Sequence, residues 1–412
     1  MSNLGSDAAA PVTSAARVGE LDVLRGFALL GVLMVNISYW LTYPWFATEA
    51  QADALVVTAA DTNAQFLVRM LGGDKANTLF AFLFGVGFWV QMERLEGRGA
   101  NFQRIYLRRL LVLLAFGLCH LLLVWPFDIL HLYALAGFGL LAMRGVSNKV
   151  LLIVGLILAF AARPVITLIL GAAGISGPRF EAGFSDEAIQ ARESASTLVE
   201  LSGEFTQIGL YTWFASGLMV AWLFYAFGRF LLGAYVARRG WIQRSAELLP
   251  NWRKAALICL PLGLAGQFVA TAIDLETWPA FEALGWAHDF IHYPTVPLIA
   301  VGYVATLIVI FHSRLKPLAL VFAPVGRMAL TNYVMQTFII GYLAYASAGG
   351  PSLAGAAGPA QLAGIGIAVF AGQTLFSHLW LTQFAYGPLE WCWRALTYGQ
   401  MPKMRRAPAL AG

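Results

Sequence analysis

Two histidines and an aspartate lie where one apolar run of the sequence ends and the next begins. His120 comes near the end of the first run, and Asp128 and His131 follow after a short turn. Asp128 and His131 can share a helix face at a spacing of three, and the turn brings His120 within reach of Asp128. A carboxylate that orients an imidazole creates a general base, although Asp128 could equally cap the second helix. We therefore predict His120 and Asp128 as catalytic residues, with His131 and Tyr133 in the substrate-binding site.

A polar stripe marks the first apolar run. Arg25 and Asn36 are eleven positions apart, which at 100° per residue places them within about 20° of the same helix face. Asp22 lies close enough to this stripe to pair with Arg25. Polar groups inside a membrane tend to mark sites, but a snorkelling arginine and an asparagine bonded to a neighbouring helix would explain the same residues. We predict that Asp22, Arg25 and Asn36 bind substrate.

Further charged and imidazole groups lie in other apolar runs. Arg163 costs about 2.5 to 3.5 kcal/mol inside a membrane, so it should face the bundle interior and meet a carboxylate or an anionic ligand. Its depth favours Asp128 as the partner, and we include Arg163 among the substrate-binding residues. His288 and His292 have the i, i+4 spacing of half a metal site, but no third ligand is apparent and no metal is expected. His378 is isolated and is typical of a packed core residue.

The composition of the chain requires a membrane to surround these groups. Of 412 residues, 59% are hydrophobic and only 12% charged, where soluble domains carry roughly a quarter charged residues. Apolar runs of about 20 residues recur and match a hydrocarbon layer about 30 Å thick. Because the runs do not alternate with period two, helices rather than a barrel must satisfy the backbone. These features exclude a soluble globule and predict an all-α, polytopic membrane bundle.

Charged and Pro/Gly-rich breaks divide the chain into ten predicted spans. A tail at 1–20 precedes the transmembrane bundle at 21–386, and an interfacial helix with a basic cytoplasmic tail follows at 387–412. With both termini cytoplasmic, most of the 27 lysines and arginines fall in inner segments, as the positive-inside rule requires. The long outer loop near 173–205 is either a partly helical lid or an unstructured connector. The spans are 21–42, 77–93, 105–125, 128–144, 149–172, 206–237, 254–273, 290–312, 326–346 and 361–384.

Five blocks of sequence resemble the YeiB family of bacterial inner-membrane proteins (domain of unknown function 418). Because these separated blocks occur in order over nearly the whole chain, the resemblance is specific. It implies a multi-pass protein of the bacterial inner membrane, in a family often linked to transport. The blocks are Leu21 to Ile37 (LDVLRGFALLGVLMVNI), Lys75 to Gly87 (KANTLFAFLFGVG), Gly117 to His120 with Asp128 to Leu130 and Tyr133-Ala134, Gly326 to Gln336 (GRMALTNYVMQ), and Gly387 to Gly399 (GPLEWCWRALTYG).

The first run also looks like that of membrane-bound acyltransferases, including the O-antigen acetylases and the lysosomal heparan glucosaminide acetyltransferase. Those enzymes use cytoplasmic acyl-CoA to modify a sugar on the other face of the membrane. The similar pattern is Arg25-Gly26 followed eleven positions after the arginine by a polar residue. That residue is a histidine in the acetylases, but it is Asn36 in this chain, as it is an asparagine in the heparan branch. The heparan branch has a histidine farther along the first loop, and this chain has Ala47 at the matching distance. His120 with Asp128 is therefore the replacement candidate.

These observations predict a membrane-embedded acyltransferase that moves an acyl group from cytoplasmic acyl-CoA to an outward-facing glycan or lipid-linked acceptor. Arg25 and the inner basic rim would hold the CoA phosphates, Asn36 the thioester or oxyanion, and His120 would deprotonate the acceptor. A transporter or flippase is the first alternative, disfavoured by few intramembrane carboxylates and no visible inverted repeat. A non-catalytic scaffold or sensor is the second. Membrane lipids are expected partners, nucleic acid and metal cofactors are not, and homo-oligomer formation is left open.

Overall fold

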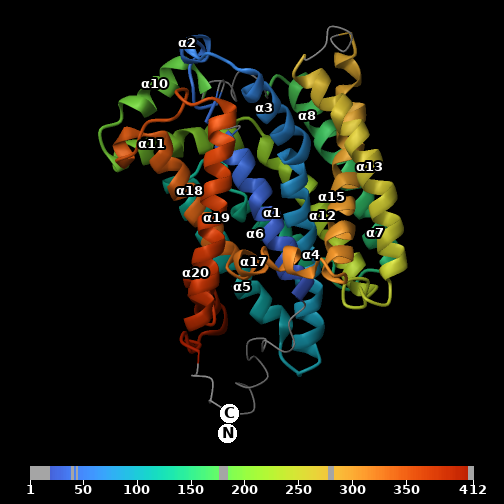
Figure 1. Cartoon of the computed structure of the whole chain (residues 1–412). Coiled ribbons are helices and arrows are strands. Elements are labelled where there is room, and N and C mark those ends of the chain that lie inside the picture. The colour runs from blue at the N-terminus through green and yellow to red at the C-terminus, as the bar shows by residue number, and fades with distance from the viewer. Residues whose placement is uncertain (1–18, 39–40, 43–44, 176–183, 277–282, 407–412) are drawn as a thin grey trace.

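The computed structural model describes residues 19–38, 41–42, 45–175, 184–276 and 283–406. These residues form an all-α bundle without β-strands, in which the long helices run side by side (Figure 1). The all-α, polytopic class expected from the continuous apolar runs is confirmed. Its long helices are α1 (Gly19–Ser38), α4 (Gly73–Glu96), α5 (Phe102–Leu123), α6 (Leu130–Ala142), α7 (Asn148–Ile157) continued by η2 (Leu158–Ala162) and α8 (Arg163–Ala172), α12 (Leu218–Arg238), α13 (Leu249–Asp274), α15 (His288–Phe311), α18 (Ala329–Ala344) and α19 (Pro359–Gln383).

Short helices connect and cover the long ones. Of those labelled in Figure 1, α2, α3, α10 and α11 lie at one end of the bundle, while α17 and α20 lie toward the opposite end. They are α2 (Glu49–Ala54), α3 (Ala59–Leu71), α10 (Asp186–Ser194), α11 (Leu198–Leu210), η4 (Tyr211–Ala215), η5 (Gly285–Ala287), α16 (Lys316–Leu320), α17 (Ala323–Arg327), η6 (Ala346–Ala348) and α20 (Pro388–Tyr398).

Seven helices in the described part of the chain are long and apolar enough to cross a membrane. They comprise α1, α5, the combined α7–η2–α8 helix, α12, α13, α15 with η5, and α19. The other three predicted spans coincide with α4, α6 and α18, which are either more polar or shorter. The count of ten spans and the cytoplasmic placement of both termini stay predictions.

The prediction of one continuous helix at 206–237 is wrong, because the structure breaks this segment into two helices. The apolar run at 206–237 was expected to form a single helix, but α11 ends at Leu210 and α12 begins only at Leu218. Between them lie the π-helical turn η4 and Gly217, whose φ of 71° is left-handed. Glycine adopts this conformation without the penalty that a side chain would bring. Hydropathy alone does not reveal such a break because the residues on both sides are equally apolar.

The long outer loop is partly helical. It contains α10 and the start of α11, while residues 176–183 lie outside the described part. The Arg192 side chain of α10 donates to the Trp45 carbonyl at 3.3 Å, and Gln51 donates to the Glu193 carboxylate at 2.6 Å. Of the two alternatives for this loop, the partly helical cover is the one that forms, and it packs against the first outer segment.

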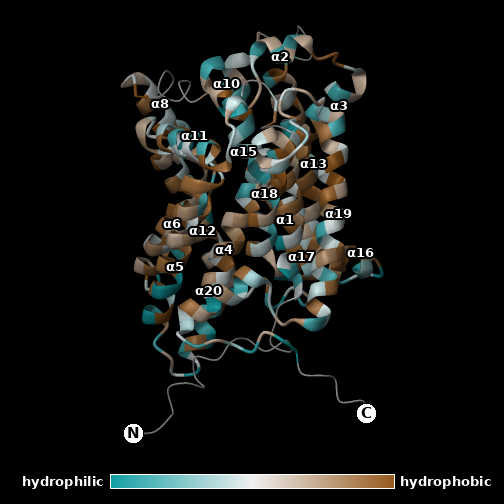
Figure 2. Cartoon of the chain, turned by 90° about the vertical axis from the view of Figure 1, so that its left-hand side faces the viewer, coloured by the Kyte–Doolittle hydropathy of each residue, from teal (hydrophilic) through white to brown (hydrophobic). Residues whose placement is uncertain are grey.

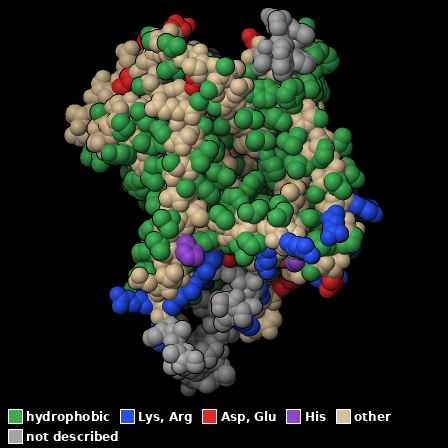
Figure 3. Space-filling model, viewed as in Figure 1, with side chains coloured by type: hydrophobic (Ala, Val, Ile, Leu, Met, Phe, Trp, Pro, Cys, Tyr) green, Lys and Arg blue, Asp and Glu red, His purple; other side chains and the backbone are tan. Residues whose placement is uncertain are grey.

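The distribution of side chains on the surface agrees with a membrane protein. Hydrophobic side chains cover the middle of the molecule, and Lys and Arg gather toward the end where α20 lies (Figure 3). Hydrophilic residues are prominent on α2 and α10 at the opposite end, whereas the long helices are mainly hydrophobic (Figure 2). We call the basic end the inner end, as the positive-inside rule predicts, and the opposite end the outer end.

Candidate functional site

A buried His–Asp–His cluster lies at the outer ends of α5 and α6. His120 Nδ1 is 2.8 Å from Asp128 Oδ1, and His131 Nδ1 is 3.0 Å from Asp128 Oδ2. The exposed fractions are 5% for His120, 0% for Asp128 and 1% for His131. The three residues meet as their spacing predicts, and their catalytic role stays a prediction.

A tight turn between α5 and α6 positions Asp128. The Trp125 amide donates to the His120 carbonyl at 2.8 Å, and the Asp128 amide donates to the Trp125 carbonyl at 3.2 Å. Asp128 Oδ2 also accepts from the His131 backbone N–H at 3.0 Å, which satisfies a free amide at the start of α6. Capping and imidazole orientation were alternative interpretations of Asp128, and its two oxygens provide for both.

The two histidines have different surroundings on their far side. Trp213, on the π-helical turn η4, lies edge-on to His131 with 5.4 Å between ring centroids. Its indole N–H donates to the Pro126 carbonyl at 2.7 Å, which holds the ring in place. His131 Nε2 has no hydrogen-bond partner among the described residues. His131 therefore faces an aromatic wall, and His120 is the histidine that reaches another functional group.

That functional group is a hydroxyl on α18. His120 Nε2 lies 2.9 Å from Thr337 Oγ1, and the Tyr333 ring, one helical turn earlier, lies 5.4 Å from the His120 ring. An ionised carboxylate only accepts hydrogen bonds, so Asp128 fixes the proton of His120 on Nδ1. Neutral His120 then presents the lone pair of Nε2 toward Thr337.

A cavity of about 310 Å³ extends from the inner end of the bundle toward this cluster. Asp22 and Arg25 line its inner part, and Val32, seven residues further along α1 and thus about 10 Å along the axis, lines its deep part. The deep end is also lined by Ile129, beside Asp128, and by Tyr333. Because the Tyr333 ring contacts His120, the cluster lies directly behind the end wall of the cavity.

Arginines dominate the charged part of the cavity lining. Asp22 and Glu390 are the acidic side chains among the lining residues. Asp22 pairs with Arg25 at 3.4 Å, as their spacing predicts. The cavity therefore has an excess of positive charge at its inner end, which favours an anionic ligand. The arginines are Arg25, Arg94, Arg98, Arg109, Arg327 and Arg394.

The C-terminal helix α20 closes one side of this cavity. Glu390 Oε1 accepts from the backbone amides of Leu330 at 2.6 Å and Thr331 at 3.1 Å, so it caps the start of α18. Burial raises the pKa of Glu390 above its usual value. The Trp393 indole donates to the Arg109 carbonyl at 3.1 Å, which joins α20 to α5. The predicted interfacial helix is thus part of the wall of the candidate site.

Two of the predicted substrate-binding residues differ in their relation to the cavity. Tyr133 lines it, and its hydroxyl donates to the Asn77 carbonyl of α4 at 3.1 Å. Asn36 is buried, with an exposed fraction of 8%, but it is not a lining residue of the cavity. The stripe predicted on α1 therefore reaches the cavity through Asp22 and Arg25.

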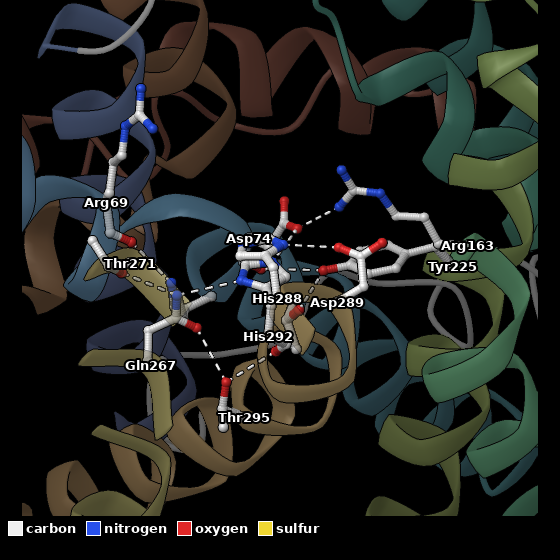
Figure 4. A network of polar contacts seen from close by, with 12 residues as sticks. Arg69, Asp74, Arg163, Tyr225, Gln267, Thr271, His288, Asp289, His292 and Thr295 are labelled. Atoms are coloured by element: carbon white, nitrogen blue, oxygen red, sulfur yellow. Dashed lines mark hydrogen bonds and ion pairs between the residues drawn. The ribbon is translucent and has the colours of Figure 1, made fainter. Parts of the chain in front are cut away.

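The predicted partner of Arg163 is wrong. Arg163 forms an ion pair with Asp74 at the start of α4 instead of with Asp128, and Figure 4 shows the two side chains facing one another. Its guanidinium also lies over the rings of Trp222 at 4.6 Å and Tyr225 at 5.5 Å. Depth in the membrane suggested Asp128, but depth does not determine which neighbour a helix faces. Arg163 follows the π-helical turn η2 and points between α4, α12 and α15.

The histidines at the start of α15 belong to the same outer network. His292 Nε2 lies 3.4 Å from Asp74 Oδ2, and the Gln267 side chain lies 3.3 Å from His292 Nδ1 (Figure 4). The rings of His288 and His292 stack with 5.2 Å between centroids. Across the described ranges, no group of three or more His, Cys, Asp or Glu side chains is arranged to hold a metal ion.

An aromatic cluster covers the candidate site on its outer side. The Phe46 and Trp125 rings stack at 5.9 Å, and Phe205 and Tyr345 pack against Phe46. Arg192 from α10 lies over Phe46 at 5.4 Å. The outer loop therefore covers the rings that separate the His–Asp–His cluster from the outer surface.

Residues that sequence reasoning missed lie mainly on α18. Tyr333 occurs within a sequence block singled out only for its family resemblance, and Thr337 follows that block. Thr337 has no charged or imidazole neighbour in the sequence that would have marked it. The predicted span at 77–93 leaves Asp74 in the segment before it, whereas α4 begins at Gly73 and includes Asp74. Knowledge of which helices are neighbours would have been needed to find these three.

Comparisons with known proteins agree with the resemblance seen in the sequence. Residues 236–400 match the family described as "Protein of unknown function (DUF418)". The chain is 33% identical to "Uncharacterized protein YxaH" of Bacillus subtilis (strain 168) over 406 residues, covering 94% of this chain and 96% of the relative. It is 31% identical to "Uncharacterized protein YeiB" of Escherichia coli (strain K12), covering 92% and 95%. The protein therefore belongs to the YeiB/DUF418 family of multi-pass membrane proteins.

Proposed function

We propose that the protein is a transmembrane acyltransferase that takes its acyl group from cytoplasmic acyl-CoA. The observation that carries the proposal is the cavity that begins among arginines at the inner end and ends at Tyr333, against the His120 ring. A donor with an anionic head and a long uncharged arm that ends in a thioester matches this cavity, which is basic at its inner end and aromatic at its deep end.

The donor half of the proposal rests on charge and shape. The phosphates of CoA would lie among the arginines, since guanidinium groups bind phosphate oxygens through paired N–H donors. The pantetheine arm and acyl chain would extend past the Phe80 and Phe84 side chains toward Tyr333, all of which line the cavity. The thioester would then arrive near His120. Coenzyme A is a co-substrate in this scheme, and no metal is required.

The acceptor half rests on the His–Asp–His cluster. His120, oriented by Asp128, would remove the proton of an acceptor hydroxyl that approaches from the outer side. An outward-facing glycan or lipid-linked acceptor would approach from the side of the outer cover, which lies between the cluster and the surface. We place the protein in the bacterial inner membrane, where acyl-CoA is available on one side only.

Transfer of label is the direct test. Purified protein in bilayer nanodiscs that contain bacterial lipid and glycan extract would receive acetyl-, butyryl- or palmitoyl-CoA labelled in the acyl group. We expect label on a lipid or glycan, and loss of transfer in His120→Gln with acyl-CoA binding retained. Transfer at the normal rate by His120→Gln would remove His120 from the mechanism. If none of the three donors is bound, the acyl-CoA proposal is wrong.

A small-molecule transporter or flippase is the second candidate, and one observation favours it. Asp74, Arg163 and His292 form an ionisable network in the outer half of the bundle, on three different helices. Intramembrane groups of this kind occur along substrate and proton paths. Substrate-dependent counterflow in proteoliposomes without CoA, lost in Asp74→Asn, would support this function. If neither acyl transfer nor counterflow is observed, the scaffold or sensor alternative remains.

A further inference from the structure

Thr337, His120 and Asp128 have the arrangement of a hydroxyl–imidazole–carboxylate triad. Thr337 Oγ1 lies 2.9 Å from His120 Nε2, and His120 Nδ1 lies 2.8 Å from Asp128 Oδ1. In such a triad the carboxylate fixes the tautomer, the imidazole takes the hydroxyl proton, and the oxygen becomes a nucleophile. We propose that Thr337 is an acyl-accepting nucleophile and that the reaction passes through an ester on its side chain.

Hydrogen-bond accounting favours a reactive hydroxyl. Asp128 accepts at Oδ1, which requires the proton of neutral His120 to be on Nδ1. His120 Nε2 is then an acceptor, and Thr337 carries the only proton between the two atoms. The hydroxyl also lies 2.7 Å from the Val334 carbonyl, an ordinary contact within a helix. One hydroxyl proton thus has two acceptors, and rotation about the Cβ–Oγ1 bond alone redirects the O–H group from the helix carbonyl to the base.

The position of Thr337 relative to the cavity suits this role. Tyr333 lines the deep end of the cavity, and Thr337 follows it by four residues, one turn toward the outer end of α18. Thr337 is 1% exposed and His120 5%, so water is largely excluded from both. Exclusion of water protects an ester intermediate from hydrolysis until the acceptor arrives. A thioester at the cavity end would be about one helical turn, or 5.4 Å, from the nucleophile along the helix axis.

The proposed steps balance. The Thr337 oxygen attacks the thioester carbonyl carbon, the carbon–sulfur bond breaks, and the hydroxyl proton passes through His120 Nε2 to the leaving CoA sulfur. In the second half, the acceptor hydroxyl attacks the ester carbon and gives its proton to His120. That proton returns to the Thr337 oxygen as the bond between that oxygen and the acyl carbon breaks. No oxidant, metal or further co-substrate is needed.

This inference builds on the proposed transferase, but its first test does not depend on CoA. The small ester p-nitrophenyl acetate acylates activated hydroxyl groups, so nanodisc-bound protein should release p-nitrophenol in a burst of about one equivalent, as expected of an acyl-enzyme. Peptide mass spectrometry should then find acetyl ester on the peptide that contains Thr337. We expect the burst in wild type and Thr337→Ser, and its loss in the isosteric Thr337→Val and in His120→Gln.

A second threonine provides a matched control. Thr374 on α19 also donates to a backbone carbonyl of its own helix, that of Phe370 at 2.9 Å, and within the described part of the chain it forms no hydrogen bond with an imidazole or a carboxylate. Thr374→Val should retain the burst and the ester on Thr337. A burst in Thr337→Val equal to that of wild type, or an ester on another residue, overturns the proposal. The proposal is also overturned if wild type shows neither a burst nor hydrolysis that depends on Thr337.

The same variants then distinguish this inference from the proposed function. With an acyl-CoA that supports transfer, a covalent intermediate predicts that labelled free CoA is incorporated into unlabelled acyl-CoA without any acceptor, and that this exchange is lost in Thr337→Val. Transfer with neither exchange nor ester would retain the transferase and reject the nucleophile. Ester from p-nitrophenyl acetate without use of any acyl-CoA would retain the nucleophile and reject the CoA donor.

Discussion

At the scale of single residues, Asp128 determines the chemistry available to the site. It is fully buried, and a buried carboxylate is tolerated only where donors satisfy its oxygens. His120 and the side chain and backbone of His131 supply those donors. Because each oxygen serves a different histidine, an isosteric amide cannot replace both acceptors at once.

Asp128→Asn is therefore expected to lower the rate of acyl transfer by about 10² to 10⁴, as removal of a tautomer-fixing carboxylate does in hydroxyl–imidazole triads. The Asn side chain has one oxygen and one NH₂ group, so it can no longer accept a hydrogen bond from both histidines. His120 would then lose the acceptor that fixes its proton on Nδ1. Acyl-CoA affinity should stay within about twofold, since Asp128 is not a lining residue of the cavity. Single-turnover transfer and equilibrium binding measure the two quantities. Asp289→Asn, at an exposed carboxylate, is the control.

Arg25→Ala is expected to weaken acyl-CoA binding about tenfold or more, because one charge-assisted hydrogen bond contributes about 1.5 to 3 kcal/mol. Arg25 lines the inner part of the cavity. The rise in melting temperature caused by acyl-CoA should shrink in this variant and stay normal in Arg314→Ala, an exposed inner-end arginine outside the lining. Equal binding by Arg25→Ala would exclude a phosphate contact at this residue.

The sequence predicted the residue contacts that depend on short spacing. Asp22–Arg25 and His120–Asp128 are three and eight positions apart, so helix geometry and one tight turn determine both pairs. Asp74–Arg163 joins residues 89 positions apart. Such a pair depends on which helices are neighbours, and hydrophobic periodicity does not contain this information. For the same reason the Thr337 contact with His120 was not predicted.

At the scale of elements, the crossing of α1 with α17 forms one wall of the cavity. A Cβ atom added to Gly26 would lie 2.0 Å from the Phe322 carbonyl oxygen, so the two backbones are in direct contact. Gly26→Ala is expected to destabilise the protein by about 1 to 3 kcal/mol, as overpacking does, and to weaken acyl-CoA binding.

The measurement for this crossing is thermal unfolding with and without acyl-CoA. Gly372→Ala on α19 is the matched control, since a Cβ there would meet no atom within 4 Å. The control should be as stable as wild type or slightly more so, because alanine is a better helix former than glycine. If Gly26→Ala unfolds like the control, α1 and α17 are not in contact in the membrane.

Asp61 joins the start of α3 to the start of α19 outside the apolar spans. The Thr58 hydroxyl, followed by the Ala360 and Thr58 amides, donates to its carboxylate and holds the pKa of Asp61 below its usual value. A lowered folded-state pKa stabilises the fold above the unfolded-state pKa, about 3.9, and this contribution is lost as the pH falls through the folded-state pKa. Asp61→Asn should therefore lower the melting temperature at pH 7, and the difference from wild type should shrink below about pH 4. A constant difference across this range would contradict the assignment.

The same distinction between local and non-local information applies to helices. Apolar runs located every long helix of the bundle, because a membrane selects for continuous hydrophobic length. The break at Gly217 and the π-helical turn before Arg163 were not predicted. Both depend on backbone conformation within a uniformly apolar sequence. They also position Trp213, which packs against His131, and Arg163, which belongs to the outer network with Asp74.

At the scale of the whole molecule, the bundle is divided into an open inner half and a covered outer half. The cavity and its arginines belong to the inner half, and the aromatic cluster under α10 belongs to the outer half. The His–Asp–His cluster lies between them. Such a division suits a reaction whose two substrates arrive from opposite sides, since one group can then meet both while water is excluded from each path.

This argument depends on the sidedness of the membrane, which cysteine labelling can test. In a background where Cys119, Cys259 and Cys392 are replaced by alanine, Glu187→Cys on α10 should react with a membrane-impermeant maleimide in intact spheroplasts. Arg244→Cys, in the exposed basic loop between α12 and α13, should react only after permeabilisation. The positive-inside rule predicts this order because the arginine-rich loops stay cytoplasmic. The opposite order would place the arginine-lined cavity on the side without acyl-CoA, and the proposed donor would then be excluded.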